Sequence, residues 1–394
     1  MVMRRISVLY NKATQSGVLK DRLTGKKYFI NKIFYFEFKK FIMGDSKIDS
    51  RVVEFVSKVQ IHQNEISLRE FETKIPLKHI QIELTTSCNL RCKHCYLENS
   101  VLKKEFLAFD YIKKIIEEGL ELGLETVSIT GGECLLHPEI NKIVEYISSK
   151  DVDLIVFTNG TILTRKLLDT LKQNVKLVRV SIDGGNSTTH DNIRGRGNFN
   201  KTLKNISKLL DSEIKVDINA VVSRNNLNEI TRMLDLFKSR DVTFHFDRYI
   251  PNSNSDILSI SDEEYYEALK NVIGQNKINI NHELTQSKER YCGAGISYVY
   301  IRNDGNVAFC PTVPVNFIGG NIKLNTLKNI WEESKFFKNK RFQTCKFYDI
   351  CPGNFLCGGG CRSRSLYMYG GFNEPDKQMC LIVSSMIGKD VPGL

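Results

Sequence analysis

The sequence predicts an α/β protein whose centre is a partial (β/α)6 TIM-like barrel, preceded by a winged-helix-like module and followed by a cysteine-rich domain. Three observations lead to this fold class. Strand-like and helix-like segments alternate from about residue 77 onward, which is the pattern of a parallel sheet. The residues before that point carry a hairpin pattern and helix patterns. The cysteines are unevenly spread, because none of the 11 precedes Cys88 and seven lie between Cys292 and Cys380.

Composition and charge restrict the class of protein. The 394 residues are 41% hydrophobic and 26% charged, which is typical of a globular chain with a sizeable core and excludes a disordered or fibrous protein. The formal charge of +11 favours an acidic partner. No apolar run reaches the ~20 residues of a membrane span, and the run Ile6–Tyr10 is too short for a signal peptide. We therefore expect a cytoplasmic protein without a membrane span, whose reduced cysteines bind metal or carry redox chemistry.

Residues 1–75 are expected to form the winged-helix-like module. A Thr-Gly turn between two short runs predicts a β-hairpin over residues 17–31. Apolar residues near helical spacing predict a helix from Ile33 to Ile42 that stops at Gly44. Asp49 is the expected N-cap of a second helix through residues 52–56.

Residues 76–290 contain the strand and helix units of the predicted barrel. About six units fall short of the eight of a complete barrel, so the barrel is expected to be partial. The predicted strands are IQIEL, TVSITGG, DLIVFTNG, LVRVSIDG, KVDINAVV and VTFHFDRY. The predicted helices cover residues 110–122, the segment after Pro138, the segment from Thr164, residues 199–210 and residues 228–240.

Residues 291–394 lose this alternation. The segment SYVYIRNDGNVAFCP predicts two alternating strands joined by an Asn-Asp-Gly turn. The rest consists of short elements between cysteines. Metal bound by these thiolates could simply stabilise a small domain with little core, and this structural role remains an alternative to a catalytic one.

Three cysteines follow the first predicted barrel strand directly. Cys88, Cys92 and Cys95 stand in TSCNLRCKHCY, and the loops after parallel strands build the active sites of such folds. Three thiolates this close together can bind one face of a four-iron cluster and leave one iron free. Zinc is the rival, but no fourth cysteine or second cysteine pair lies nearby. His94 could be a ligand, yet its position between two cysteines better suits a side chain that covers the cluster.

These residues resemble the radical S-adenosylmethionine (SAM) enzymes. CxxxCxxC after the first strand is similar to that family's motif, and Gly131, Gly132 and Glu133 of TGGE resemble its segment for the amino group of the cofactor's methionine. The segments FTNGT, SIDG and HDNIRG also fall where the family places strand ends that face the cofactor. The resemblance implies that Ser181 and Asn219 face the ribose or carboxylate of SAM and that Arg194 faces the carboxylate.

The resemblance also implies the chemistry and the cofactors. A [4Fe-4S] cluster held by the three cysteines would bind SAM, and one electron would cleave the cofactor to a 5'-deoxyadenosyl radical that takes a hydrogen atom from the substrate. The implied electron donor is a flavodoxin- or ferredoxin-type protein. Cys134 stands where the family commonly has proline, and we interpret it as a buried, unreactive thiol.

The second set of cysteines resembles the SPASM domain, an extension of radical enzymes that holds auxiliary iron-sulfur clusters. Gly305 stands five residues before Cys310, as in that pattern, whereas the expected CxxC is widened to CKFYDIC. The family's interleaved scheme implies two auxiliary [4Fe-4S] clusters. The ligands would be Cys292, Cys310 and Cys361 for the nearer cluster and Cys345, Cys351, Cys357 and Cys380 for the farther one. The nearer cluster would then have an open iron or a further ligand such as Asp247, Asp256 or His282.

The first region resembles the winged-helix module with which peptide-modifying radical enzymes recognise a leader peptide. Such modules add the leader as a strand to an exposed sheet edge, and an acidic leader would suit the positive chain. A nucleic-acid partner is disfavoured because the second helix, DSRVVEFVSK, is not notably basic.

Together the three regions resemble maturases of ribosomally made peptides, and CGAG at Cys292–Gly295 with the later cysteine spacings is most similar to the subtilosin type (sactipeptide maturation, a bacteriocin pathway). The implied reaction joins a peptide Cys sulfur to a carbon of another residue, with an open auxiliary iron holding the peptide thiolate. Alternatives are a carbon-carbon crosslink, epimerisation, sulfatase maturation and tetrapyrrole modification. A non-catalytic binding protein stabilised by metal is the alternative outside enzymes.

Overall fold

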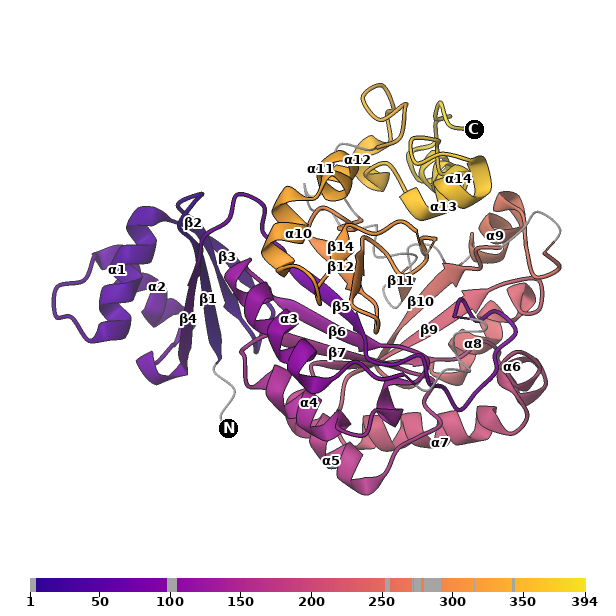
Figure 1. Ribbon diagram of the computed structural model, residues 1–394, viewed down its shortest axis with the longest axis horizontal. Coiled ribbons are helices and arrows are strands. Elements are labelled where there is room, and N and C mark those ends of the chain that lie inside the picture. The colour runs from indigo at the N-terminus through magenta and orange to yellow at the C-terminus, as the bar shows by residue number, and fades with distance from the viewer. Residues whose placement is uncertain are drawn as a thin grey trace.

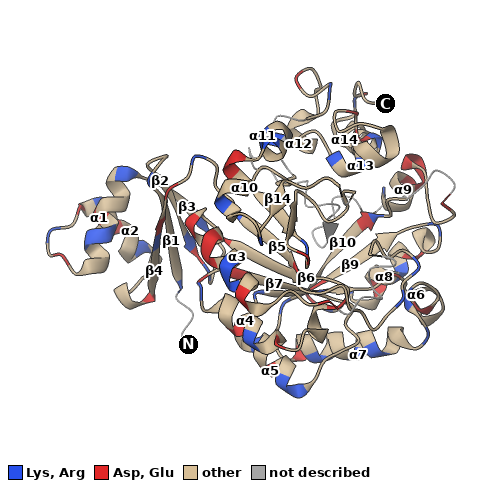
Figure 2. Ribbon diagram, viewed as in Figure 1, with Lys and Arg blue, Asp and Glu red and all other residues tan. Residues whose placement is uncertain are grey.

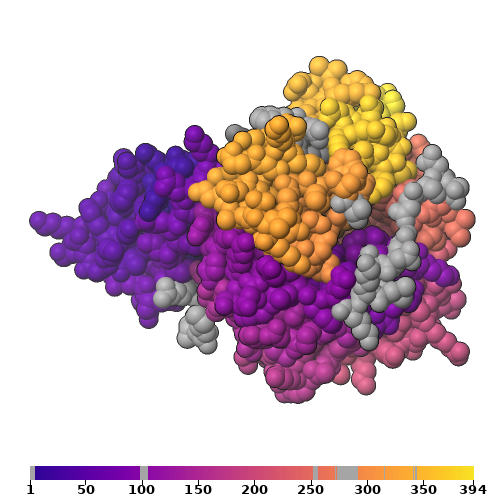
Figure 3. All heavy atoms as spheres, in the orientation of Figure 1, coloured from indigo at the N-terminus to yellow at the C-terminus, as the bar shows by residue number. Residues whose placement is uncertain are grey.

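The computed structural model describes residues 5–97, 105–251, 256–270, 272, 278–279, 292–314, 316–341 and 344–394. The strands form two sheets, one of four strands in the order β3-β2-β1-β4 and one of ten in the order β11-β10-β9-β8-β7-β6-β5-β12-β13-β14. The small sheet and its helices project from one side of the molecule, and the C-terminal segment packs over the large sheet (Figures 1 and 3). No helix among the described residues is long and apolar enough to cross a membrane.

The N-terminal module combines its sheet with two helices, as the sequence predicts. Its strands are β1 (Ile6–Asn11), β2 (Ser16–Asp21), β3 (Lys27–Asn31) and β4 (Ile66–Phe71), its helices α1 (Lys32–Met43) and α2 (Ser50–Val59), and a short 3-10 turn, η1 (Gln63–Glu65), precedes β4. The predicted hairpin is the antiparallel pair of β2 and β3. Asp49 accepts a hydrogen bond from the backbone N of Arg51, and Gly44 ends α1 with a φ of 79°. The parallel pairing of β1 with β4 is absent from the sequence prediction.

The large sheet confirms the predicted partial barrel. Its six parallel barrel strands are β5 (His79–Glu83), β6 (Thr126–Thr130), β7 (Asp153–Thr158), β8 (Leu177–Ser181), β9 (Val216–Val222) and β10 (Val242–Arg248). The predicted helices correspond to α3 (Phe109–Glu121), α4 (Ile140–Ser148), α5 (Arg165–Asn174), α7 (Asn198–Asp211) and α8 (Ile230–Leu236), the last preceded by the turn η4 (Leu227–Glu229). The sequence prediction omits α6 (Ser187–Arg194), α9 (Asp262–Leu269) and β11 (Ile278–Asn279).

Side chains alternate between the two faces of the barrel strands. Ile80 and Ile82 of β5 are fully buried, and Ile80 reaches the backbone of α3 near Gly119. The opposite face is polar and joins neighbouring strands. Its described contacts are His79 Nε2 to Ser128 Oγ at 2.7 Å, Arg179 Nη2 to Asp217 Oδ2 at 3.1 Å and His245 Nε2 to Asp217 Oδ2 at 2.9 Å. The inner wall of the half-barrel is therefore built for polar contents, whereas its outer wall packs against helices.

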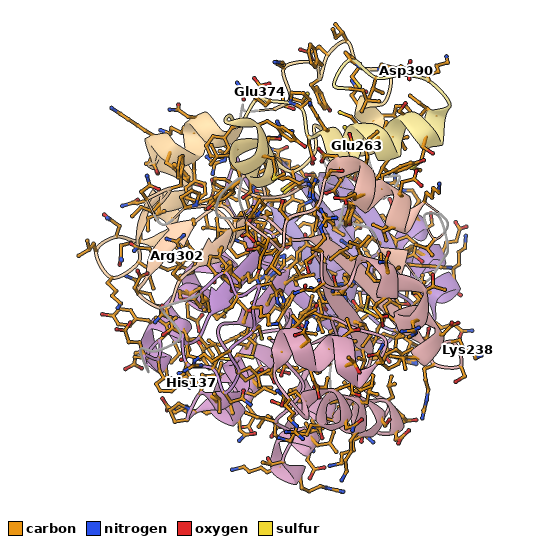
Figure 4. The ribbon with its side chains drawn as sticks, turned by 90° about the vertical axis from the view of Figure 1, so that its right-hand side faces the viewer. His137, Lys238, Glu263, Arg302, Glu374 and Asp390 are labelled. Atoms are coloured by element: carbon orange, nitrogen blue, oxygen red, sulfur yellow. The ribbon has the colours of Figure 1, made fainter. Side chains whose placement is uncertain are left out.

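The C-terminal region extends the barrel sheet. The predicted hairpin is formed by β12 (Tyr298–Ile301) and β13 (Asn306–Ala308), followed by β14 (Gly320–Asn321), and β12 pairs with β5 in parallel. Helices α10 (Leu327–Glu333), α11 (Lys335–Arg341), α12 (Asn354–Cys357), α13 (Arg362–Tyr369) and α14 (Lys377–Ile387) follow. Tyr266 of α9 donates a hydrogen bond to Ser385 of α14 at 2.7 Å. Figure 4 shows this junction, with Glu263 of α9 below the segment that carries Glu374 and Asp390.

The N-terminal module contacts the barrel through charged side chains. Arg22 pairs with Asp151 at 2.7 Å, and Lys20 pairs with Asp153, the first residue of β7. Arg69 of β4 donates to the carbonyl of Leu124, which precedes β6. These contacts lie at the amino ends of the barrel strands, whereas the Cys88 loop follows the carboxyl end of β5. The module is therefore attached at the end of the barrel opposite the cysteine loop.

Candidate functional site

The first three cysteines lie in the loop between β5 and α3. Cys88, Cys92 and Cys95 are free, partly buried thiols. Local backbone contacts fold this loop, because Leu90 N donates to Cys88 Sγ at 3.4 Å and Cys95 N donates to Cys92 O at 3.2 Å. Burial raises the pKa of the Cys92 thiol to about 11 and also raises the pKa of Cys88. A bound cluster would replace the protons of these thiols, since metal ligation requires the thiolates.

The two glycines of TGGE allow the loop after β6 to lie against the strand that leads into the cysteine loop. Gly131 has a φ of 147°, and a Cβ atom there would lie 2.3 Å from the carbonyl oxygen of Thr85. A Cβ atom on Gly132 would lie 2.5 Å from the carbonyl oxygen of Ser87. Gly132 N donates to Thr85 O at 2.8 Å, and Glu133 N donates to Ser87 O at 2.8 Å. Close approach of these two loops therefore requires glycine at both positions.

Glu133 connects the ends of two strands. Its carboxylate, 1% exposed, accepts hydrogen bonds from Leu135 N at 3.1 Å, Thr158 Oγ1 at 2.9 Å and Asn159 N at 2.7 Å. Burial raises the pKa of this carboxyl group, while the three donors oppose the rise. The carboxylate therefore has a structural role that the sequence does not reveal. Its predicted contact with the amino group of a cofactor stays a prediction.

Arg194 and His94 meet at Asp183, which follows β8. Arg194 Nε donates to Asp183 Oδ2, and Arg194 Nη1 lies 3.9 Å from Cys92 Sγ. His94 Nε2 lies 3.3 Å from the same carboxylate oxygen, and Val221 N donates to Asp183 Oδ1 at 2.8 Å. Burial alone would raise the pKa of Asp183, but Arg194 and His94 hold it below its usual value. Burial lowers the pKa of His94 to about 4, so its imidazole is neutral at pH 7.

Ser181 and Asn219 are neighbours across β8 and β9. The two residues are paired in register, and Ile182 N donates to Asn219 O at 2.9 Å. Both are half-buried at the carboxyl ends of their strands. The residues predicted to contact SAM thus all belong to the strand ends and loops at the cysteine-bearing end of the barrel. Their individual contacts with the cofactor stay predictions.

Two polar groups beside the cysteine loop were missed by sequence reasoning. Asn159 Nδ2 donates to Asn89 Oδ1 at 2.9 Å and lies 3.9 Å from Cys88 Sγ. Tyr300 of β12 donates to Glu83, and its hydroxyl lies 3.5 Å from that of Tyr96. The FTNGT motif, which contains Asn159, was a signal for the first group. The second depends on the pairing of β12 with β5, for which the sequence has no signal.

Cys134 lies in the short turn η3 (Cys134–Leu136). It is fully buried, and its thiol donates to the carbonyl of Phe157 at 3.1 Å. Burial raises the pKa of this thiol well above its usual value. A neutral, hydrogen-bonded thiol in the core agrees with the interpretation of Cys134 as unreactive.

The seven later cysteines line two cavities. Those of the first auxiliary cavity are Cys292, Cys310 and Cys361, and those of the second auxiliary cavity are Cys345, Cys351, Cys357 and Cys380. This division is the one that the interleaved scheme implies. In the described part of the chain, no group of three or more Cys, His, Asp or Glu side chains is spaced to hold a single metal ion. Thiols around a cavity fit a multi-iron cluster better than one ion.

The described lining of the first auxiliary cavity contains neither a carboxylate nor a histidine. Its polar members include Thr344 and Ser363, beside the three cysteines. Asp256 accepts from the Tyr249 hydroxyl at 2.6 Å instead, and Asp247 is not part of the lining. His282 lies outside the described residues. The structure therefore gives no support to Asp247 or Asp256 as a fourth ligand.

Family models match both cysteine regions. A model of the radical SAM superfamily matches residues 82–237, and a model of the SPASM iron-sulfur cluster-binding domain matches residues 292–357. The AdoMet-dependent heme synthase of Methanosarcina barkeri is 30% identical over 329 residues, covering 75% of this chain and 93% of that protein. The antilisterial bacteriocin subtilosin biosynthesis protein AlbA of Bacillus subtilis is 33% identical over 309 residues, covering 73% of this chain and 68% of that protein.

Solved structures share the architecture. Streptococcus suis SuiB bound to the precursor peptide SuiA has a TM-score of 0.67 at 16% identity, covering 94% of this chain and 97% of that chain. The enzyme anSMEcpe with bound AdoMet has a TM-score of 0.62 at 21% identity, covering 73% of this chain and 90% of that chain. At these identities the similarity supports the fold.

Proposed function

The chain belongs to the radical SAM superfamily and carries a SPASM domain, and from this premise we propose that it is a maturase that forms a Cys thioether crosslink in a ribosomally made precursor peptide. As a member of this superfamily it is an enzyme, and its cofactors are SAM and [4Fe-4S] clusters. When bound and reduced, the first cluster supplies the cleavage of SAM to a radical that removes a hydrogen atom from the substrate. The substrate and the bond formed are the proposal.

The observation that carries the proposal is the unequal division of the seven C-terminal cysteines. The second auxiliary cavity has four thiols, one for each iron of a cube, whereas the described lining of the first has three and no other strong iron ligand. An iron at the first cavity would then be open to a thiolate from the substrate. The 33% identity to AlbA supports a peptide as the source of that thiolate.

The residues around the first cluster are proposed to orient the cofactor and exclude water. Cys88, Cys92 and Cys95 would hold the cluster, and Gly131, Gly132 and Glu133 would bound the methionine end of SAM. Ser181, Arg194 and Asn219 would contact its ribose or carboxylate. The Arg194 guanidinium is held by the Asp183 carboxylate, so its remaining N–H groups are oriented before the cofactor binds.

The partner proposed for the N-terminal module is the leader of the precursor peptide. Among the described strands, β3 pairs with β2 alone, so its other edge is open to an added strand. Phe29 on this edge strand is 83% exposed. Residues 1–75 contain 15 Lys and Arg against eight Asp and Glu, and Figure 2 shows basic residues along α1 and α2. These charges favour an acidic leader. Because the module lies at the far end of the barrel, the peptide must extend along the protein to reach the cysteine loop.

The proposal is tested with anaerobically reconstituted enzyme, SAM, reductant and the small Cys-containing peptide encoded beside this chain. We expect formation of 5'-deoxyadenosine and a peptide whose mass is lower by two hydrogens for each thiol that no longer reacts with an alkylating agent. A peptide that loses two hydrogens but keeps its thiols would replace the thioether with a carbon-carbon crosslink. An unchanged mass with inverted stereochemistry would indicate epimerisation.

Tetrapyrrole modification is the second candidate, because the similarity to the heme synthase covers 93% of that protein. The N-terminal module argues against it, since a small tetrapyrrole offers no strand for an open sheet edge. Incubation with a haem precursor and SAM separates the two candidates. Appearance of a haem absorption spectrum would favour this candidate over the peptide.

A further inference from the structure

The two auxiliary cavities share a wall formed by the segment Cys357–Cys361. The three glycines between these cysteines all have positive φ, at 53°, 98° and 72°. A Cβ atom on Gly359 would lie 2.6 Å from Thr344 Oγ1, and one on Gly360 would lie 2.6 Å from Asp376 Cβ. Only glycine lets the chain turn this sharply against those two side chains. Residues that contact this wall can therefore act on both cavities.

Asp376 connects a cysteine of each cavity. Its carboxylate Oδ2 accepts from the backbone N of Cys361 at 2.7 Å, and its backbone carbonyl accepts from the backbone N of Cys380 at 2.9 Å. Asp376 also lines the second auxiliary cavity and is 2% exposed. Two hydrogen bonds through one residue thus join the ligand sets of the two predicted clusters.

Arg364 holds the carboxylate of Asp376 from the other side. Arg364 Nε donates to Asp376 Oδ1 at 2.8 Å, and Arg364 Nη2 donates to Oδ2. The side chains are 5% and 1% exposed. The backbone N of Arg364 donates to Cys361 Sγ at 3.4 Å. A bidentate pair this deeply buried is rigid, and its charges are poorly screened by water.

We propose that the Asp376–Arg364 pair is a positioning pair that sets the reduction potentials of the two auxiliary clusters relative to each other. Hydrogen bonds to the ligands and nearby charge are the protein's means of tuning such clusters. The negative charge of Asp376 opposes the addition of an electron to a cluster, and the positive charge of Arg364 favours it. This inference depends on the auxiliary clusters and not on the peptide substrate, so it survives if the maturase proposal fails.

The test is an anaerobic redox titration of the reconstituted full-length enzyme, followed by electron paramagnetic resonance together with iron analysis. Asp376→Asn keeps an acceptor for Cys361 N but removes the negative charge. At the potential where the wild-type auxiliary signal is half reduced, we expect about a tenfold higher ratio of reduced to oxidised cluster, or about 59 mV for one electron. Arg364→Gln should change the ratio in the opposite direction, and the double variant should return it toward the wild-type value.

Two controls separate tuning from structural support. Asp376→Glu keeps the charge and should retain the wild-type potentials. Asp217→Asn breaks an equally buried pair with Arg179 in the barrel, where the side chains are 7% and 6% exposed, and should leave the auxiliary potentials unchanged. The proposal is overturned if the two charge-removing variants shift the ratio in the same direction, leave it unchanged, or both lose auxiliary iron.

Discussion

Replacing Gly131 by alanine tests whether the loop after β6 positions the cysteine loop. Alanine would have to adopt a φ of 147°, at a cost of about 1–3 kcal/mol. Its Cβ would also lie 2.3 Å from the carbonyl oxygen of Thr85, a backbone atom three residues before Cys88, and relieving that overlap costs about 1–3 kcal/mol more. We therefore expect a loss of about 2–6 kcal/mol from the free energy of unfolding, a large part of the ~5–15 kcal/mol of a typical domain.

The matched control is Gly25→Ala in the turn between β2 and β3. Gly25 also has a positive φ, 73°, but a Cβ atom there would meet nothing within 4 Å. It should therefore lose only the conformational part, about 1–3 kcal/mol. Urea titration of both reconstituted variants measures the loss, and iron analysis measures the first cluster. Equal losses for the two variants, with full iron in Gly131→Ala, would refute the argument that loop contact requires glycine.

Three further predictions concern the first cluster and the N-terminal module. Cys92→Ala should lose about four irons per chain, keep the auxiliary iron and abolish SAM cleavage. Glu70 has a pKa lowered to about 2, first by hydrogen bonds from Lys12 and Lys39, so Glu70→Gln should destabilise the enzyme at pH 7, with the difference in urea midpoint disappearing as the pH falls from 4.5 toward 2. Phe29→Asp should weaken binding of an acidic leader peptide at least tenfold in a fluorescence titration, whereas Leu23→Asp, at a turn residue 78% exposed, should not.

Local patterns predicted most elements of the fold. The alternation of apolar strand runs with amphipathic helices located all six barrel strands, because each pattern is complete within about ten residues. Caps worked for the same reason, as Asp49 and Gly44 act on backbone groups within a few residues. The omission of α6 has a local cause as well, since its segment STTHDNIR has few apolar residues. The domain boundaries at residues 75 and 290 stay predictions.

Contacts between distant segments could not be predicted in this way. The parallel pairing of β1 with β4 and of β12 with β5 joins strands separated by about 60 and more than 200 residues, and strand periodicity contains no information about the partner. The same holds for Asp183, which the sequence places in SIDG but does not connect with Arg194 and His94. Burial made these charged contacts possible, because a buried carboxylate needs such partners.

The sequence alone determined the fold class, the family and the three thiols of the first cluster, because these depend on residue types at short, regular spacings. The tertiary structure decided which of the seven later thiols share a cavity, since cysteines up to 69 positions apart converge there. It also decided that the Glu133 carboxylate connects strand ends and that Asp376 lies between the two cavities. Such roles depend on backbone donors and charges brought together by packing, which no local pattern of residues encodes.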